Sequence, residues 1–290
     1  MSEKLLSGYA WYELWGPIYL IIIAIGIYYY KNRIVDSRLY PVSVKQRRYF
    51  LIASAMLYIA KGSPISVLAD DFLFSAHVFE LSVLYFVVVP LFILSFPKEW
   101  LRAYIWHYRL RNALKLVSFP WIAALLFNGG LTAYFLPSFF NVIQRSAVLE
   151  VSVQALLLAA SFIMWWCIIT PLPVPGRFSH FSMMVYVLAN AILLMPIAIF
   201  MLVVTDAAHY PVYIEAAGMI LPDLTAVSDQ QLAGGILKAL QLGSYGVALF
   251  HIISSWGKQE EESEGLIEEE NIRIVQGIVI HLPDKTKGRL

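Results

Sequence analysis

The sequence is poor in charged residues and almost free of cysteine. Asp, Glu, Lys and Arg make up 14% of its 290 residues, whereas soluble domains carry about 25%. So few polar side chains cannot cover a water-facing surface, which excludes a soluble globular domain. The single Cys167 excludes an intramolecular disulfide and a CxxC metal or redox motif. A net charge of +1 excludes the strongly basic footprint of a nucleic-acid-binding protein.

Long apolar runs are abundant instead. Hydrophobic residues make up 59% of the chain and the mean hydropathy is +0.68, which is typical of a polytopic membrane protein in contact with a lipid bilayer. A helix that crosses a hydrocarbon core needs about 20 apolar residues. The sequence therefore predicts an all-α domain over residues 1–256 with seven transmembrane helices, near 11–30, 49–68, 74–96, 115–136, 148–171, 180–204 and 231–255. The second is the weakest, because Lys61, Gly62 and Pro64 interrupt it.

The basic residues predict how the helices are oriented. Cytoplasmic loops of membrane proteins carry an excess of Lys and Arg. The first, third and fifth loops and the C-terminal tail together hold 17 of the 21 Lys and Arg residues, and the opposite side has only Lys4 and Arg145. We therefore expect the N-terminus outside and the C-terminus in the cytoplasm. The first apolar run is expected to be a retained anchor, because Met1–Ser7 does not resemble a cleavable signal peptide.

Two segments on the predicted inner side do not span the membrane. Residues 257–290 are expected to form an acidic cytoplasmic tail, which opens with a run of glutamates that is usually solvated and unstructured. Within this tail, Ile272–Ile280 resembles a short strand. Residues 98–114 alternate basic and aromatic side chains, which predicts either an interfacial helix or an ordinary loop.

A candidate metal site lies near the predicted outer ends of the helices. Ionisable groups within spans are costly, so they indicate a function by default. His77 and Glu80 are three residues apart, hence on one face of the third helix, while Met201 and His209 lie at the outer end of the sixth. Imidazole and thioether ligands suit copper, so these four residues could bind it. The alternative is that the histidines are hydrated and the methionine fills an apolar gap.

Three other polar residues form a second candidate cluster at the same end. Asp229 opens the seventh helix, Lys238 lies deeper in it, and Glu150 marks the outer end of the fifth. Because a charge within the bilayer favours a partner over isolation, we expect Lys238 to lie within reach of Glu80, Glu150 or an outer-loop Asp. A retinal Schiff base on Lys238 is disfavoured, because the lysine lies too far from the midplane.

Two neutral residues and the lack of enzyme motifs complete the pattern. Asn128 and Asn190 lie at mid-span and are expected to form a hydrogen bond between the fourth and sixth helices. The sequence has no HExxH, no GxSxG and no paired catalytic carboxylates. We therefore expect no catalytic residue and no enzyme activity.

Several strings resemble one family, in matching order over roughly residues 10–255. The most specific is Asp229–Gly234, and the others are Ser75–His77, Leu84–Leu91, Met164–Trp166 with Pro171, Asn190–Pro196 and Tyr210–Tyr213. Together they are similar to the CtaG family of caa3-type cytochrome c oxidase assembly factors. The resemblance implies a seven-helix protein in the plasma membrane of a bacterium, needed to mature the oxidase, and copper as a possible cofactor. Its implied partner is an oxidase subunit or a copper donor protein.

The resemblance also assigns particular residues. His77 corresponds to the first histidine of the third helix, and Asp229 to the acidic residue before the seventh. The chain departs at Leu81, where many members have a second histidine, and at Tyr134 and Phe135, where many have Trp-His. Fewer imidazoles favour a chaperone for the subunit, or a platform for a copper donor. The alternative is a transporter for copper or another small ligand, although we find no inverted repeat.

Overall fold

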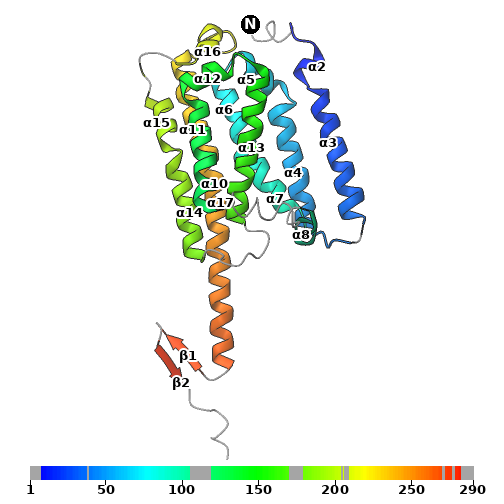
Figure 1. The fold of residues 1–290 in the computed structure, drawn as a ribbon, viewed down its shortest axis with the longest axis vertical. Coiled ribbons are helices and arrows are strands. Elements are labelled where there is room, and N and C mark those ends of the chain that lie inside the picture. Colours follow the sequence, from blue (N-terminus) through cyan, green and yellow to red (C-terminus); the bar gives the residue numbers. More distant parts are fainter. Residues whose placement is uncertain are drawn as a thin grey trace, which may run out of the picture.

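The computed structural model describes residues 8–37, 39–104, 119–169, 179–203, 205, 209–269, 272–275 and 278–281. Figure 1 shows a bundle of helices from which one long helix projects. Among the described residues, five helical segments are long and apolar enough to cross a membrane, and the number rises to seven if two bent helix pairs each form one span. The prediction of an all-α fold with several membrane-spanning helices is therefore confirmed, and the exact number of seven spans stays a prediction.

The N-terminal region contributes a short helix, an outlying span and a bent span. These are α2 (Trp11–Leu14), α3 (Pro17–Tyr29) with its π-helical extension η1 (Tyr30–Val35), and α4 (Val44–Lys61) followed by α5 (Pro64–Asp71). A capping box of Ser43 and Gln46 opens α4. The α4–α5 pair bends by 45° where Gly62, Ser63 and Pro64 interrupt the helix. This break ends α4 at Lys61, in the interior of the predicted second span.

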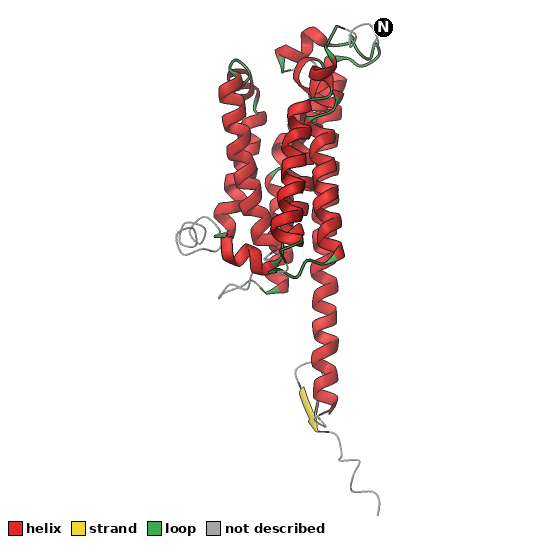
Figure 2. Ribbon diagram, turned by 90° about the vertical axis from the view of Figure 1, so that its right-hand side faces the viewer, coloured by secondary structure: helices red, strands yellow, loops and turns green. Residues whose placement is uncertain are grey.

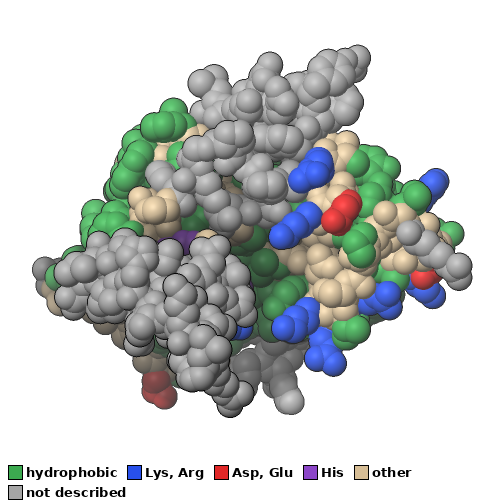
Figure 3. Space-filling model, turned by 90° about the horizontal axis from the view of Figure 1, so that it is seen from below, with side chains coloured by type: hydrophobic (Ala, Val, Ile, Leu, Met, Phe, Trp, Pro, Cys, Tyr) green, Lys and Arg blue, Asp and Glu red, His purple; other side chains and the backbone are tan. Residues whose placement is uncertain are grey.

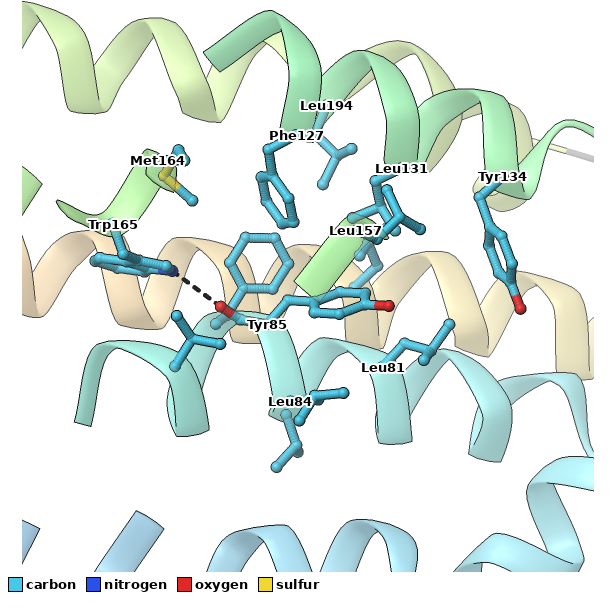
Figure 4. Packing of buried hydrophobic residues seen from close by; sticks show 14 of the residues in the cluster. Leu81, Leu84, Tyr85, Phe127, Leu131, Tyr134, Leu157, Met164, Trp165 and Leu194 are labelled. Carbon is cyan, nitrogen blue, oxygen red and sulfur yellow. Dashed lines mark hydrogen bonds between the residues drawn. The ribbon is translucent and has the colours of Figure 1, made fainter. Parts of the chain in front are cut away.

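The third span is the centre of the bundle, and a proline shapes it. It consists of α6 (Phe74–Val83), the π-helical η2 (Leu84–Val88) and α7 (Val89–Ser95). Pro90 has no N–H, so it cannot donate the π-type bond to the carbonyl five residues earlier, at Tyr85. That carbonyl accepts hydrogen bonds from Ser161 Oγ and Trp165 Nε1 instead, both at 2.9 Å. Figure 4 shows the tryptophan bond among the buried side chains, so the local break joins α6–α7 to the fifth span.

Prolines also divide the fourth and sixth spans. The fourth comprises α10 (Pro120–Ala124), η3 (Leu125–Gly129) and α11 (Gly130–Phe135), and it bends by 80° into α12 (Pro137–Ile143). The sixth comprises α14 (His180–Leu193) and α15 (Met195–Val203), separated at Leu194 just before Pro196. Between them lies α13 (Ala147–Ile169), the fifth span, and α16 (Pro211–Ala216) follows the sixth.

The last helix is longer than predicted. α17 spans Ala226–Glu269 and extends well beyond the bundle (Figure 2). The glutamate-rich segment 260–269, which we expected to be unstructured, continues this helix as far as Glu269. The segment contains no proline, so every backbone N–H in it can donate a helical hydrogen bond. The predicted strand is found as the hairpin of β1 (Ile272–Val275) and β2 (Ile278–His281), which pair antiparallel.

One end of the bundle carries many basic side chains. Figure 3 views the end from which α17 projects, and Lys and Arg side chains outnumber Asp and Glu on the visible coloured surface. The short helix α8 (Lys98–Tyr104) lies at this end and begins the predicted interfacial segment, whose residues 105–114 lie outside the described residues. This distribution agrees with the predicted cytoplasmic side, and the orientation itself stays a prediction.

Candidate functional site

A buried ion pair joins the second and third spans at the end of the bundle opposite α8. Lys61, the last residue of α4, pairs with Glu80 of α6. The Glu80 side chain is 1% exposed and that of Lys61 is 19% exposed. A carboxylate this deep in an apolar bundle is costly unless a cation neutralises it. Lys61, at the end of α4, supplies the cation that Glu80 needs.

Gln154 of α13 connects this pair to other polar side chains. Its Oε1 accepts a hydrogen bond from Lys61 Nζ at 3.2 Å. Its Nε2 donates to Glu150 Oε1 at 2.9 Å and to the Tyr134 hydroxyl at 3.3 Å. One amide thus links the second, fourth and fifth spans, and it uses both its acceptor and its donor to do so.

His77 is the far end of the same connected set. It is buried, and its Nε2 lies 2.9 Å from the Tyr134 hydroxyl. Tyr134 lies parallel to the imidazole, while Phe140 meets it edge-on. Because Tyr134 bonds both to His77 and to Gln154, the chain of contacts runs unbroken from the imidazole to the ion pair. We call the set of His77, Tyr134, Gln154, Glu150, Lys61 and Glu80 the ionic network.

Asp229 holds the helix that carries His77 and Glu80. Its Oδ2 accepts a hydrogen bond from the Phe74 amide at 2.7 Å, and its Oδ1 accepts one from the Ser75 amide at 3.2 Å. The residue that precedes α6, Leu73, has no side chain able to cap it. Asp229 therefore acts as the N-cap of α6 from another helix, and its charge also suits the positive end of the helix dipole.

The prediction that Lys238 lies within reach of Glu80, Glu150 or an outer-loop Asp is wrong. Lys238 Nζ donates to the Ala191 carbonyl at 3.1 Å and to Gln241 Oε1 at 2.6 Å, because its position on α17 faces the sixth span rather than α6. Glu80 is paired with Lys61 instead. The Glu150 Oε1 atom accepts hydrogen bonds from Gln154 Nε2 at 2.9 Å and from Gln144 Nε2 at 3.1 Å. The three residues of the second candidate cluster thus have separate partners.

The predicted bond between Asn128 and Asn190 is confirmed. Asn128 Nδ2 donates to Asn190 Oδ1 at 2.7 Å, and Gln241 Nε2 donates to the Asn190 carbonyl at 3.2 Å. Both asparagines and Gln241 are fully buried. We call Asn128, Asn190, Gln241 and Lys238 the amide network, which joins the fourth, sixth and seventh spans.

The four residues of the candidate metal site have different surroundings. His77 and Glu80 belong to the ionic network, whereas Met201 is buried beside Gly234 of α17. His209 is exposed, its ring meets Phe200, and its amide donates to Gln230 Oε1 at 3.0 Å. Within the described ranges, no group of three His, Cys, Asp or Glu residues is arranged to hold a metal ion. The copper site stays a prediction.

An open cleft leads to the ion pair. It has a volume of about 320 Å³, lies between α2–α3 and α4–α5, and includes Glu13, Tyr19, Lys61, Ser66, Asp70 and Glu80 in its lining. Glu80 accordingly lies at the floor of the cleft, although almost none of its surface is exposed. The ionic network is thus reachable from outside the bundle on its α3 side.

Three phenols beyond the spans fasten this end of the bundle. The Tyr210 hydroxyl donates to the Phe135 carbonyl at 2.7 Å and the Tyr213 hydroxyl to the Ala69 carbonyl at 2.8 Å. Burial raises the pKa of both groups, so they remain protonated donors. Burial and the hydrogen bond to Asp71 raise the pKa of Tyr9 to about 12. These donors hold α16 and the N-terminal segment against the helices.

Sequence reasoning missed three members of the ionic network, Lys61, Gln154 and Tyr134. Lys61 carried a usable signal, because it is an ionisable residue inside a predicted span. Gln154 lies four residues after Glu150, and therefore on the same helix face. Tyr134 was noted only as a departure from the family pattern, and its phenol is what contacts His77.

Comparison with known proteins gives one result. A family model described as "Cytochrome c oxidase caa3 assembly factor (Caa3_CtaG)" matches residues 26–259. No curated protein and no solved structure matches the chain. The matched range includes every member of the ionic and amide networks.

Proposed function

Because the chain belongs to the Caa3_CtaG family of cytochrome c oxidase caa3 assembly factors, we propose that it acts in the membrane as a non-enzymatic chaperone for a subunit of that oxidase. The family match over residues 26–259 is the observation that carries this proposal. The protein would bind the subunit during its maturation and leave the finished complex.

The ionic network supports a binding role at the end of the bundle where it lies. Its charges are held in place by hydrogen bonds from three spans and by the Asp229 cap of α6. Where Lys61 and Glu80 line the open cleft, such preorganised charges can bind a partner without a large ordering cost.

The proposal does not include copper binding by this chain, because the predicted ligands do not lie together in the described part of the structure. The imidazole Nε2 of His77 is occupied by Tyr134, and the candidate ligands His209 and Met201 have other neighbours. These residues do not fit a resident copper ion. We therefore propose that copper reaches the oxidase subunit from a separate donor protein.

A deletion strain tests the oxidase role. We expect loss of caa3 oxidase activity and of assembled oxidase in membranes, restored by the wild-type chain on a plasmid. Added copper should not restore activity if the protein acts as a subunit chaperone, whereas rescue by copper would favour delivery or transport. Normal oxidase in the deletion strain would refute the assembly role. Metal analysis of the purified protein should find less than one copper per chain.

Orientation has its own test. We propose that the cleft and the ionic network face the outside of the cell, because Lys and Arg concentrate on the opposite side. Reporter fusions near residue 40 should be cytoplasmic, and fusions near residue 220 should be external. A cytoplasmic report at 220 would overturn this arrangement.

A further inference from the structure

The seam between α3 and the rest of the bundle has a polar part and an apolar part. The polar part is the cleft of about 320 Å³ described above. The apolar part is a groove of about 270 Å³, whose lining includes Ile22, Gly26 and Tyr30 on the α3 side and Ser54, Leu57 and Phe92 opposite. α3 itself has no buried residue, so it is loosely packed along this seam.

The two parts follow one another along the same helix faces. On α3 the cleft includes Tyr19, and the groove begins at Ile22 and Ile23, about one turn later. On α4 the cleft includes Lys61, and the groove includes Leu57, again one turn away. A single elongated molecule can therefore occupy both, with a polar end in the cleft and an apolar end in the groove.

The charges of the cleft specify the polar end. Three carboxylates line it, those of Glu13, Asp70 and Glu80, against the single ammonium of Lys61. The Glu80 Oε2 atom is buried and accepts no hydrogen bond from the described residues. An ammonium group would satisfy it, and Tyr19 also lines the cleft. Lys61 supplies the opposite charge that a phosphate next to such an ammonium needs.

The depth of the seam identifies the molecule. Trp11, Tyr12 and Trp15 lie beside the cleft with most or half of their surface exposed, and such aromatic side chains mark the headgroup level of a bilayer. Below that level, the groove runs alongside a span in the hydrocarbon region. We propose that the α3–α4 seam binds one phospholipid with an ammonium headgroup, with its headgroup in the cleft and an acyl chain in the groove.

Native mass spectrometry of the full-length protein tests this site. The protein is purified in mild detergent and equilibrated with equal amounts of phosphatidylethanolamine and phosphatidylglycerol. We expect one retained lipid, with phosphatidylethanolamine favoured about tenfold, the size of effect that one charge-assisted hydrogen bond supplies. Equal retention of the two lipids, or none of either, would overturn the proposal.

Two kinds of variant separate the headgroup from the acyl chain. Two variants change the headgroup site, Asp70→Asn at an exposed position and Glu80→Gln. Each should still retain lipid but reduce the preference for phosphatidylethanolamine over phosphatidylglycerol several-fold. Gly26→Phe should abolish retention of both lipids, because a Cβ at Gly26 meets nothing within 4 Å and the ring can fill the groove. Ile25→Phe is the matched control, since Ile25 is 62% exposed and does not line the groove. Equal loss in both phenylalanine variants would refute the site.

This inference does not depend on the oxidase role. Lipid retention is measured on the purified protein, whereas the assembly role is measured in a deletion strain. A chain that selects its lipid but does not support oxidase maturation would refute only the proposed function. A chain that supports maturation without selecting a lipid would refute only the lipid site.

Discussion

The ionic network and the amide network both lie inside the bundle, where the first joins four spans and the second joins three, and they differ in charge and in access. The amide network pairs neutral side chains with each other and with backbone carbonyls, except for Lys238. The ionic network contains the Lys61–Glu80 pair and borders an open cleft. Hydrogen bonds between helices suffice to explain the amide network. A buried ion pair stabilises a protein no more than well-packed apolar residues would, so we infer that the ionic network serves a function.

The largest expected effect is from breaking the ion pair. Glu80→Ala leaves the Lys61 ammonium without its carboxylate inside the bundle, which should lower the free energy of unfolding by about 3–5 kcal/mol. Thermal unfolding in detergent and the amount of protein in membranes would measure this loss. Glu215→Ala is the control, because Glu215 is exposed on α16, and it should unfold like the wild type.

An apolar replacement of the pair sharpens the same comparison. Lys61→Met combined with Glu80→Met removes both charges, so stability should return to the wild-type value or exceed it. Oxidase maturation should nevertheless be lost, because the two charges that line the cleft are gone. A double variant that is stable and supports normal oxidase would show that the ionic network, like the amide network, only packs helices.

Removal of the Asp229 cap should have the next largest effect. Asp229→Ala leaves the Phe74 and Ser75 amides without their acceptor, which should cost about 1–2 kcal/mol of stability. Hydrogen exchange should accelerate first in the initial turn of α6, because that turn loses its cap. Asp223→Ala, at an exposed position, serves as the control. Unchanged exchange at α6 would contradict the capping role.

Loss of one hydroxyl should separate function from stability in the ionic network. Tyr134→Phe keeps the ring contacts but removes the group that bonds His77 and Gln154, at an expected cost of about 1 kcal/mol. Oxidase maturation should fall several-fold. Tyr213→Phe removes a buried hydroxyl that bonds only a backbone carbonyl, so it should lose similar stability and retain maturation. Equal maturation in the two variants would contradict a functional role for Tyr134.

The smallest effect is expected in the amide network. Asn190→Ala should cost about 0.6 kcal/mol, the average for hydrogen bonds between membrane helices, and leave oxidase maturation per molecule unchanged. A double-mutant cycle with Asn128→Ala isolates the pair, because the second substitution should add little once the first has removed the bond. Loss of maturation in a stable Asn190 variant would place function in both networks.

Several properties were predictable from the sequence because they depend on local composition. Apolar runs of about 20 residues marked the spans, since a bilayer imposes that length on any helix crossing it. The strings from Ser75 to Gly234 identified the family, which the match to residues 26–259 confirms. The Asn128–Asn190 bond was predictable because polar residues at similar depth in a bilayer have few other partners.

Tertiary structure alone decided which charges meet. The sequence offered two lysines within spans, Lys61 and Lys238, and the one paired with Glu80 could not be chosen from spacing. That choice depends on which helices are neighbours and on how each helix is rotated about its axis. The hydropathy of the sequence determines neither of these. The bend after Lys61 and the position of Gln154 on α13 settle it, because a hydrogen bond or ion pair needs its atoms within about 3–4 Å. The sequence determines which segments enter the membrane, whereas helix packing determines which polar groups share a site.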